Sequence, residues 1–295
     1  MKRYALFGNC QAAAMRWILQ RSQQFNENYE IVEILPSYEM RDQDAQHFCE
    51  KTLPQLSILF FQPHSHHRSI WHDHLTIRRL CAAHNVRPVA FPQINFSVYN
   101  PWETSSSNTG ALAGNDAEFI YLDSLLMNHA LAERTTQQVL DLIRENSAMM
   151  AETVKISVKQ NLNYMTSVEI DRQCDVFITD FIDHHFKNRR LMHNLNHPRG
   201  ELMAALAQRL LSHIDIDDLP AGASDLFPQH DTVIYDAVDI ALDSHLRTGE
   251  DQIVSRFEKY RDFVSQQDAG GLNAIQAEVT RHSEWLRATG YQTPN

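Results

Sequence analysis

The chain has 295 residues, of which 43% are hydrophobic and 21% are charged, ordinary values for a globular protein long enough to bury a substantial core. The formal net charge of −11 argues against a general nucleic-acid binder, whose affinity comes from Lys and Arg side chains that neutralise phosphates. It leaves room for a small anionic ligand, because a local cluster of a few cations is enough to hold one.

The N-terminal apolar stretch stops at Gly8 and is too short for a signal peptide. No run of about 18 apolar residues occurs elsewhere, so the sequence predicts neither a transmembrane helix nor membrane insertion. We therefore expect a cytoplasmic protein. Its four cysteines include no CxxC pair, which in a reducing compartment argues against disulfides and a structural zinc site.

The first hundred residues alternate between apolar runs typical of strands and segments with helical composition. Strands are predicted at 4–8, 29–35, 56–61 and 86–91, and helices between them at 10–20, 42–49 and 70–84. The third run is nearly all apolar between Pro54 and Pro63, which fits a strand buried on both faces. This βαβαβαβ order predicts an α/β fold with a parallel sheet, flanked by helices on both faces in an SGNH or flavodoxin-like manner.

The chain changes character after a loop rich in Ser, Asn and Gly at 105–115. Helices are predicted at 118–132, 135–150, 152–165, 168–186 and 200–213, followed by a mostly helical tail over 231–286 that breaks at Gly270-Gly271. We expect an α/β half over residues 1–115 and a mostly helical half over 116–295, packed as one compact unit.

The first predicted strand ends in Gly8-Asn9-Cys10-Gln11, where a helix starts at once. Ligands of open parallel sheets bind at the carboxyl ends of the strands. A helix N-terminus stabilises a thiolate through its dipole and unpaired N–H groups, and the same N–H groups can hold an oxyanion. Gly8 permits a tight turn and the close approach of a substrate. Taken alone, a cysteine at this position is more often a buried residue that fills the turn, and the segment described next favours a catalytic thiol.

The segment RLMHNLNHP at 190–198 holds a histidine in a short connection before a helix. His197, fixed between Asn196 and Pro198, is a candidate general base for a thiol. Either Asn194 or Asn196 could orient its imidazole, as in a Cys-His-Asn arrangement. The alternative is a histidine that caps the helix or packs against the sheet.

Taken together, these motifs resemble the WcbI-type capsular polysaccharide biosynthesis family, which is related in topology to the SGNH hydrolases. The resemblance rests on GNCQ after the first strand, the RLxHxxNHP segment, and the two stretches Leu59–Gln62 and Phe91–Phe96. It spans roughly residues 3–100 and 165–215. It implies that the chain binds coenzyme A or acetyl-coenzyme A as a substrate and transfers the acyl group to a sugar hydroxyl.

The resemblance also implies roles for single residues. Cys10 takes the place of the nucleophilic serine of SGNH enzymes, and His197 that of their late histidine. Asn194 stands where those enzymes normally have aspartate, and a neutral amide orients an imidazole without stabilising its protonated form. The expected oxyanion donors are the backbone N–H of Cys10 and the side chains of Gln62 and Asn95, which follow predicted strands.

An anionic ligand such as coenzyme A needs cations. The candidates for its phosphates lie near His197 or on the first helix: Lys187, Arg189, Arg190, Arg199 and Arg16. Gly8, Asn9 and Gln11 are expected to contact the same ligand at the Cys10 turn. Each cation taken singly is also consistent with a solvated basic edge.

Segment 64–74 contains five histidines, and imidazole is a common metal ligand. The segment contains no cysteine and straddles a loop and a helix start, so we expect a loop bordering the acceptor site, and no metal. The sequence contains neither a Walker loop nor GxGxxG, which argues against nucleotide hydrolysis and dinucleotide chemistry.

Three functions follow from these observations. The first is an acyltransferase with a small-molecule acyl donor and a sugar or glycan acceptor. In it, Cys10 either attacks the acyl thioester or positions it for direct attack by an acceptor hydroxyl that His197 activates. The second is a thioesterase or esterase that uses the same Cys-His site with water as the acceptor. The third is a non-catalytic protein that binds coenzyme A or a glycan.

Overall fold

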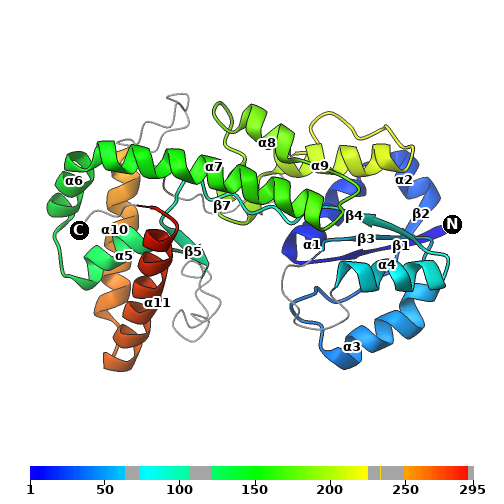
Figure 1. Cartoon of the computed structure of the whole chain (residues 1–295), viewed down its shortest axis with the longest axis horizontal. Helices are drawn as coiled ribbons and strands as arrows, with labels where there is room; N and C mark the ends of the chain where they lie inside the picture. The colour runs from blue at the N-terminus through cyan, green and yellow to red at the C-terminus, as the bar shows by residue number, and fades with distance from the viewer. Residues whose placement is uncertain (64–72, 106–120, 225–232, 234–248, 292–295) are drawn as a thin grey trace. The chain divides into compact units, whose positions relative to one another are not determined.

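A computed structural model describes residues 1–63, 73–105, 121–224, 233 and 249–291 (Figure 1). The chain divides into two compact units, each described here by itself. The first comprises Met1–Ile94, Asn163–His184 and Pro198–Pro228, and the second comprises Asn95–Leu162, His185–His197 and Gln229–Asn295. The division expected between residues 115 and 116 falls outside the described residues and stays a prediction.

The first unit contains a parallel sheet in the order β2-β1-β3-β4, which confirms the predicted α/β fold. Its strands are β1 (Lys2–Phe7), β2 (Tyr29–Ile31), β3 (Ile58–Phe61) and β4 (Arg87–Ala90). In sheets with this strand order, the direction in which strands are added reverses between β1 and β3. Ligands bind at this switch point, outside the carboxyl ends of the two strands.

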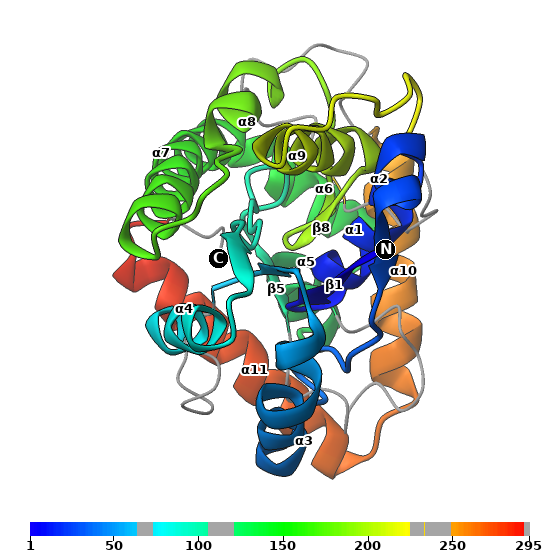
Figure 2. The ribbon, with the colours of Figure 1, turned by 90° about the vertical axis from the view of Figure 1, so that its right-hand side faces the viewer.

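Both faces of this sheet are covered. Ala5, Phe7, Leu59 and Phe61 share a buried cluster with residues of η1 (Phe48–Thr52) and α4 (His74–Ala83). On the other face, the ring of Phe25 in α2 (Gln23–Asn28) lies 4.8 Å from Tyr4 and 6.3 Å from Phe60. Figures 1 and 2 show α3 (Asp42–His47) and α4 on one side of the strands, and α2 and α9 (Gly200–His213) on the other. All four residues of β3 are buried, as predicted for a strand packed on both faces.

The helix α1 (Cys10–Leu19) begins directly after β1 and packs against β1 and α9. It buries Met15, Ile18 and Leu19, an i, i+3, i+4 set that forms one apolar stripe. Each of these side chains gains about 1.5–3 kcal/mol by leaving water. Cys49, Cys81 and Cys174 are buried free thiols, as expected of small hydrophobic residues.

The second unit is mostly helical. It contains the antiparallel pair β5 (Glu103–Ser105) and β6 (Tyr121–Asp123), and its helices are α5 (Ser124–Leu131), α6 (Thr136–Glu145), α10 (Glu250–Ser265) and α11 (Ala269–Ala288). The helix α7 (Ser147–Asp171) contributes its start to this unit and its end to the first unit, and α8 (Thr179–His185) follows it.

Several predicted boundaries were wrong. The segment predicted as a helix over 118–132 contains β6 before α5, and the breaks predicted near residues 150 and 166 do not occur, because α7 runs through both without Gly or Pro. Gly270 and Gly271 lie in the first turn of α11, where Asp268 Oδ1 accepts a hydrogen bond from the Gly271 N–H at 2.8 Å. In the described part of the chain, no helix has both the length and the apolar composition needed to cross a membrane.

Candidate active site

The Cys10 turn is fixed by a helix cap. Asn9 is the N-cap of α1, and its Oδ1 accepts a hydrogen bond from the Gln11 N–H at 2.9 Å. Its backbone carbonyl accepts bonds from the N–H groups of Ala12 and Ala13. Cys10 is therefore the first helical residue, at the carboxyl end of β1, next to the switch point of the sheet.

A buried pair of side-chain amides supports this turn. Gln62 directly follows β3, and its Oε1 accepts a bond from the Asn9 N–H at 3.0 Å. Its Nε2 donates to Gln11 Oε1 at 3.1 Å and contacts the Pro92 carbonyl at 3.5 Å. Gln11 in turn bonds both the N–H and the carbonyl of Ile94, at 2.9 and 2.7 Å. Gln62 and Gln11 thus tie the turn after β1 to the segments after β3 and β4.

Gly8 makes room for this network. A Cβ at Gly8 would lie 2.4 Å from Gln62 Oε1 and 2.8 Å from the Ala12 Cβ. Gln62 is fully buried and already bonded on both sides, so it cannot move aside cheaply. The absence of a Cβ at Gly8 therefore lets the Gln62 side chain approach the turn closely. The close approach of a substrate to the same turn stays a prediction.

The Cys10 thiol is partly buried. Burial raises the pKa of this thiol above its ordinary value, and the N–H groups of Gln11 and Cys10 oppose that shift without cancelling it. The N–H groups at the helix start lower the pKa of Cys10, as expected, but burial raises it by more. The resting form is the protonated thiol, so a reaction at sulfur needs a base to remove the proton.

His197 lies in the second unit and is the first residue of β8 (His197–Pro198), which forms a hairpin with β7 (Met192–Asn194). Asn194 organises the connection, because its Oδ1 accepts bonds from the N–H groups of Asn196 and His197 at 3.2 and 2.9 Å. The same oxygen lies 2.8 Å from His197 Nδ1. Of the two candidate asparagines, Asn194 is the one bonded to the imidazole.

These bonds define the tautomer of His197. An oxygen that accepts two backbone N–H bonds can only accept a third, so Nδ1 carries the ring proton and Nε2 carries the lone pair. Burial, with a smaller contribution from His193, lowers the pKa of His197 to about 4. The imidazole is therefore neutral at pH 7. It forms an edge-to-face pair with the Tyr121 ring, with 5.2 Å between the ring centroids. A neutral imidazole whose lone pair is on Nε2 is the form that accepts a proton there.

Two further contacts hold the hairpin within the second unit. The Leu195 N–H donates to Glu103 Oε2 at 2.9 Å, and the Phe96 N–H donates to the Leu195 carbonyl at 2.7 Å. Asn95, a candidate oxyanion donor, immediately precedes Phe96 and is partly buried. Burial raises the pKa of Glu103 to about 8, against the influence of the Leu195 N–H and Arg256.

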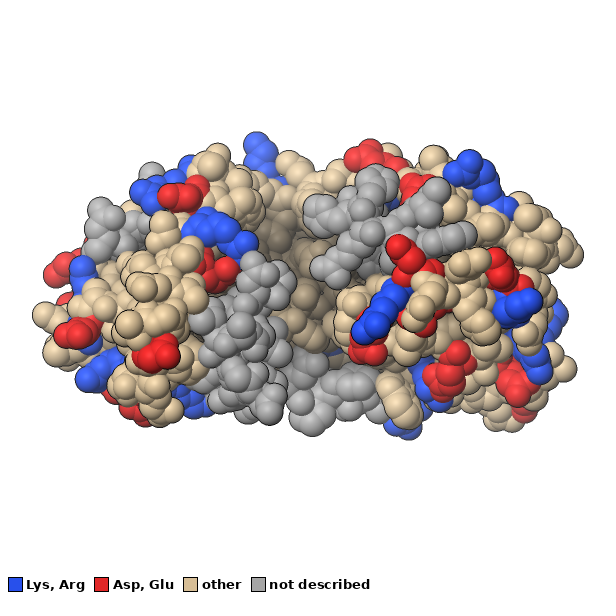
Figure 3. Space-filling view, turned by 90° about the horizontal axis from the view of Figure 1, so that it is seen from below, with Lys and Arg blue, Asp and Glu red and all other residues tan. Residues whose placement is uncertain are grey.

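The candidate phosphate ligands fall in both units. Lys187, Arg189 and Arg190 lie in the second unit, where the Lys187 Nζ sits 5.6 Å from the centre of the Phe186 ring. Arg199 is the N-cap residue of α9 in the first unit, where Arg16 forms an ion pair with Glu33. Figure 3 shows acidic and basic side chains interspersed on the face it presents.

Part of the candidate chemistry lies outside the described residues, because residues 64–72 of the histidine-rich segment are among those not described. Within the described ranges, no group of three or more His, Cys, Asp or Glu side chains could hold a metal ion. Asp73 instead caps α4, with its Oδ2 accepting a bond from the Thr76 N–H at 2.8 Å.

The structure thus brings Gly8, Asn9, Gln11 and Gln62 together around Cys10, and Asn194 together with His197. Sequence reasoning missed Glu103, which holds the histidine hairpin from a position 92 residues away in the chain. The only local signal was an acidic residue beside Trp102 at the edge of a loop-rich segment.

Three comparisons place the chain among known proteins. The family model described as "Polysaccharide biosynthesis enzyme WcbI" matches residues 3–219. None of the curated proteins matches the sequence. Among solved structures, the chain is similar to WcbI, a polysaccharide biosynthesis enzyme, in its native form without a disulfide bond between coenzyme A and a cysteine. The TM-score is 0.75 at 18% identity, over 98% of this chain and 97% of that one, a likeness of fold.

Proposed function

Because the chain belongs to the WcbI family of polysaccharide biosynthesis enzymes, we propose that it transfers an acyl group, most simply acetyl, from coenzyme A to a sugar hydroxyl. The observation that carries this proposal is the Cys10 thiol in the first turn of α1, at the carboxyl end of β1. The solved WcbI structure, a native form without a disulfide bond between coenzyme A and a cysteine, supports coenzyme A as the donor because its description names this molecule together with a cysteine.

The proposed reaction has two steps. His197 Nε2 takes the proton of the Cys10 thiol, the sulfur attacks the acetyl thioester, and coenzyme A leaves as a thiolate that regains this proton from His197. His197 Nε2 then takes the proton of a sugar hydroxyl, whose oxygen attacks the acetyl-cysteine. The products are the acetylated sugar and a Cys10 thiolate that recovers the proton. Each step conserves the acetyl group and returns the base to its starting form.

The other candidate residues have supporting roles in this proposal. The backbone N–H of Cys10 and the side chain of Asn95 stabilise the oxyanion, and Gln62 contributes mainly by holding the Asn9 N–H. Gly8, Asn9 and Gln11 shape the turn against which the acyl thioester lies. The four cations Lys187, Arg189, Arg190 and Arg199 bind the phosphates of coenzyme A.

Intact-protein mass spectrometry after mixing with acetyl-coenzyme A tests this proposal. We expect an acetyl adduct on the native chain and none on Cys10→Ala, with turnover on a sugar acceptor reduced by at least about 10³-fold. Cys174→Ala is the matched control, because burial raises the pKa of that thiol to about 12 and it should carry no acetyl group. Its removal should leave the adduct in place.

The other outcomes separate the alternatives. An adduct that water removes as fast in the absence as in the presence of sugars would favour a thioesterase. Coenzyme A bound without any adduct or turnover would favour a non-catalytic binding protein. If neither an adduct nor bound coenzyme A is found, the choice of donor is wrong.

The Asn194–His197 bond gives a second prediction. Asn194→Asp keeps an oxygen for Nδ1 and adds a negative charge, so the pKa of His197 should rise from about 4. The acidic limb of the kcat/KM profile should then move to higher pH, while Asn194→Ala should lower kcat by about 10- to 100-fold at all pH values. An unchanged acidic limb in Asn194→Asp would show that His197 is not the titrating base.

A further inference from the structure

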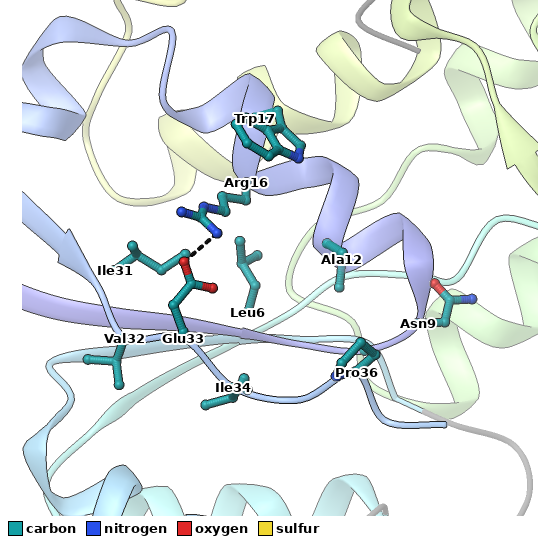
Figure 4. Close-up of a pocket in the computed structure, with 12 residues that line it drawn as sticks. Leu6, Asn9, Ala12, Arg16, Trp17, Ile31, Val32, Glu33, Ile34 and Pro36 are labelled. Carbon is teal, nitrogen blue, oxygen red and sulfur yellow. Dashed lines mark ion pairs between the residues drawn. The ribbon is translucent and has the colours of Figure 1, made fainter. Parts of the chain in front are cut away.

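A pocket of about 130 Å³ lies between α1 and residues 31–36 of the first unit. Figure 4 shows Leu6 and Ile34 inside it, Ala12 on α1 above them, the Arg16–Glu33 ion pair at one end, and Asn9 and Pro36 at the other. A protein cavity of about 150 Å³ holds a benzene molecule, so this pocket has room for one six-membered ring.

The polar groups at the Arg16 end suit a neutral ligand. Arg16 and Glu33 offset each other's charge, and the Glu33 side chain is 64% exposed, which leaves its carboxylate able to accept bonds from hydroxyl groups. Arg16 Nε is buried without a hydrogen-bond partner in the described residues, so it is a donor that lacks an acceptor. The apolar Leu6 and Ile34 can meet the C–H face of a ring.

Trp17 adds an aromatic surface at the same end. Its side chain lines the pocket and remains 52% exposed, with the Arg16 guanidinium 5.3 Å from the ring centre. An exposed indole that borders both a pocket and a hydrogen-bonding pair offers an apolar face beside polar partners. A ring with an apolar face and hydroxyl groups at its edge, which is the chemistry of a sugar, matches this combination.

The pocket is also close to the proposed nucleophile. Seven residues separate Cys10 from Trp17, which is close to two helical turns, so both lie on nearly the same face of α1, about 10 Å apart along its axis. Only the alanines Ala13 and Ala14 lie between them on that face, and Asn9 at the other end of the pocket directly precedes Cys10. A chain of two linked rings could therefore reach from Trp17 to the thiol.

We propose that this pocket is the acceptor subsite, in which Trp17, Arg16 and Glu33 hold an uncharged sugar ring of the glycan that receives the acyl group. The proposal rests on the acyl transfer proposed above for Cys10. In this proposal Arg16 does not bind the phosphates of coenzyme A, because Glu33, the ion-pair partner of Arg16, would repel a polyphosphate. The pocket would thus distinguish acceptor from donor.

Saturation-transfer NMR with three probes tests binding directly: methyl β-D-glucopyranoside, methyl α-D-mannopyranoside and N-acetyl-D-glucosamine. We expect ring-proton signals for at least one probe with the native chain, and binding about tenfold weaker in Trp17→Ala and in Glu33→Gln. Trp285→Ala is the matched control, since that indole is also 52% exposed and lies in the second unit. It should bind the probe like the native chain.

Coenzyme A titrations of the same variants distinguish the two ligands. We expect Trp17→Ala and Glu33→Gln to leave the affinity for coenzyme A unchanged and, once an acceptor is known, to raise its KM. Sugar binding that is unaffected by Trp17→Ala, or the absence of binding by all three probes up to their solubility limits, would overturn the proposal. Loss of coenzyme A affinity in Trp17→Ala would instead assign the pocket to the donor. Because the two binding measurements need no turnover, they test the sugar subsite even if the protein proves not to transfer acyl groups.

Discussion

Gly8 has no side chain because the amide of Gln62 occupies the space that a Cβ would fill. Its carbonyl accepts a bond from the Ser37 N–H at 2.8 Å, and the next residue, Asn9, is bonded to Gln62 through its N–H. At the residue scale, therefore, the position of Cys10 depends on the missing side chain of Gly8 and on the buried side-chain amides of Gln62 and Gln11. The neighbours of Cys10 place the thiol, and burial keeps it protonated until a base acts on it.

A methyl group at this position tests that dependence. Gly8→Ala should lower the free energy of unfolding by about 1–3 kcal/mol, because a Cβ 2.4 Å from Gln62 Oε1 forces a fully buried side chain to shift. Urea unfolding followed by circular dichroism measures the change. Gly270→Ala is the matched control, since its Cβ would meet only Asp268 Oδ1 at 3.4 Å, and in a helix it should be neutral or stabilising. Equal effects of the two substitutions would contradict the steric argument.

At the element scale, the β7–β8 hairpin is a short structure held by partners from elsewhere in the chain. Two pairing strands of three and two residues are far too short to be stable alone. Glu103 of β5 accepts the Leu195 N–H, and β5 is itself paired with β6 in register Glu103↔Asp123. The Asp123 N–H donates to the Tyr260 hydroxyl of α10 at 2.8 Å. The orientation of His197 thus depends on α10 through two strands.

Glu103 gives a prediction at this scale. Because burial raises its pKa to about 8, the side chain is mostly protonated at pH 7, and Glu103→Gln should unfold like the native chain there. Glu103→Leu leaves the Leu195 N–H without its acceptor and should cost about 1–3 kcal/mol. Urea unfolding at pH 7 measures both. A cost for the glutamine variant as large as for leucine would mean that the charged carboxylate, favoured by the positive charge of Arg256, is the form that holds the hairpin.

For the whole molecule, the buried histidines decide how stability responds to acid. Burial lowers the pKa of His129, His197 and His282 to about 4 from 6.5, and all three belong to the second unit. Between these values the unfolded chain binds more protons than the folded one, so their contribution is complete above about pH 6.5 and is lost as the pH falls towards about 4. Glu103 acts in the opposite direction, because its contribution to the stability of the fold is lost as the pH rises from 4.5 towards about 8.

The chain should therefore be most stable near pH 6.5, with an acidic limb to which His129, His197 and His282 contribute and which Glu103 opposes. Each unit of pKa difference corresponds to about 1.4 kcal/mol. Urea unfolding across the range from about pH 4 to pH 8 measures this profile. His129→Phe should flatten the acidic limb, because in the described residues both ring nitrogens of His129 are buried without partners. An acidic limb as steep as in the native chain would exclude His129 as a contributor.

The sequence by itself determined the elements whose signals are local. The apolar run at β3 predicted a strand buried on both faces, and the alternation of strands and helices predicted a parallel sheet. The helix predicted over 200–213 is α9, with the bounds observed. The glycine, asparagine and cysteine after β1 likewise predicted a thiol at a helix start. Backbone periodicity and helix capping act over a few residues, so they can be read without the fold.

Tertiary structure decided what depends on residues distant in the chain. The strand order, the bond from Gln62 to Asn9 over 53 residues and the bond from Leu195 to Glu103 over 92 residues join segments that no local pattern connects. Burial of Cys10 also outweighed the helix start in its effect on the thiol pKa, because desolvation depends on every segment packed around the sulfur. The pocket beside Trp17 exists for the same reason, since α1 and residues 31–36 enclose it only after the strands have paired.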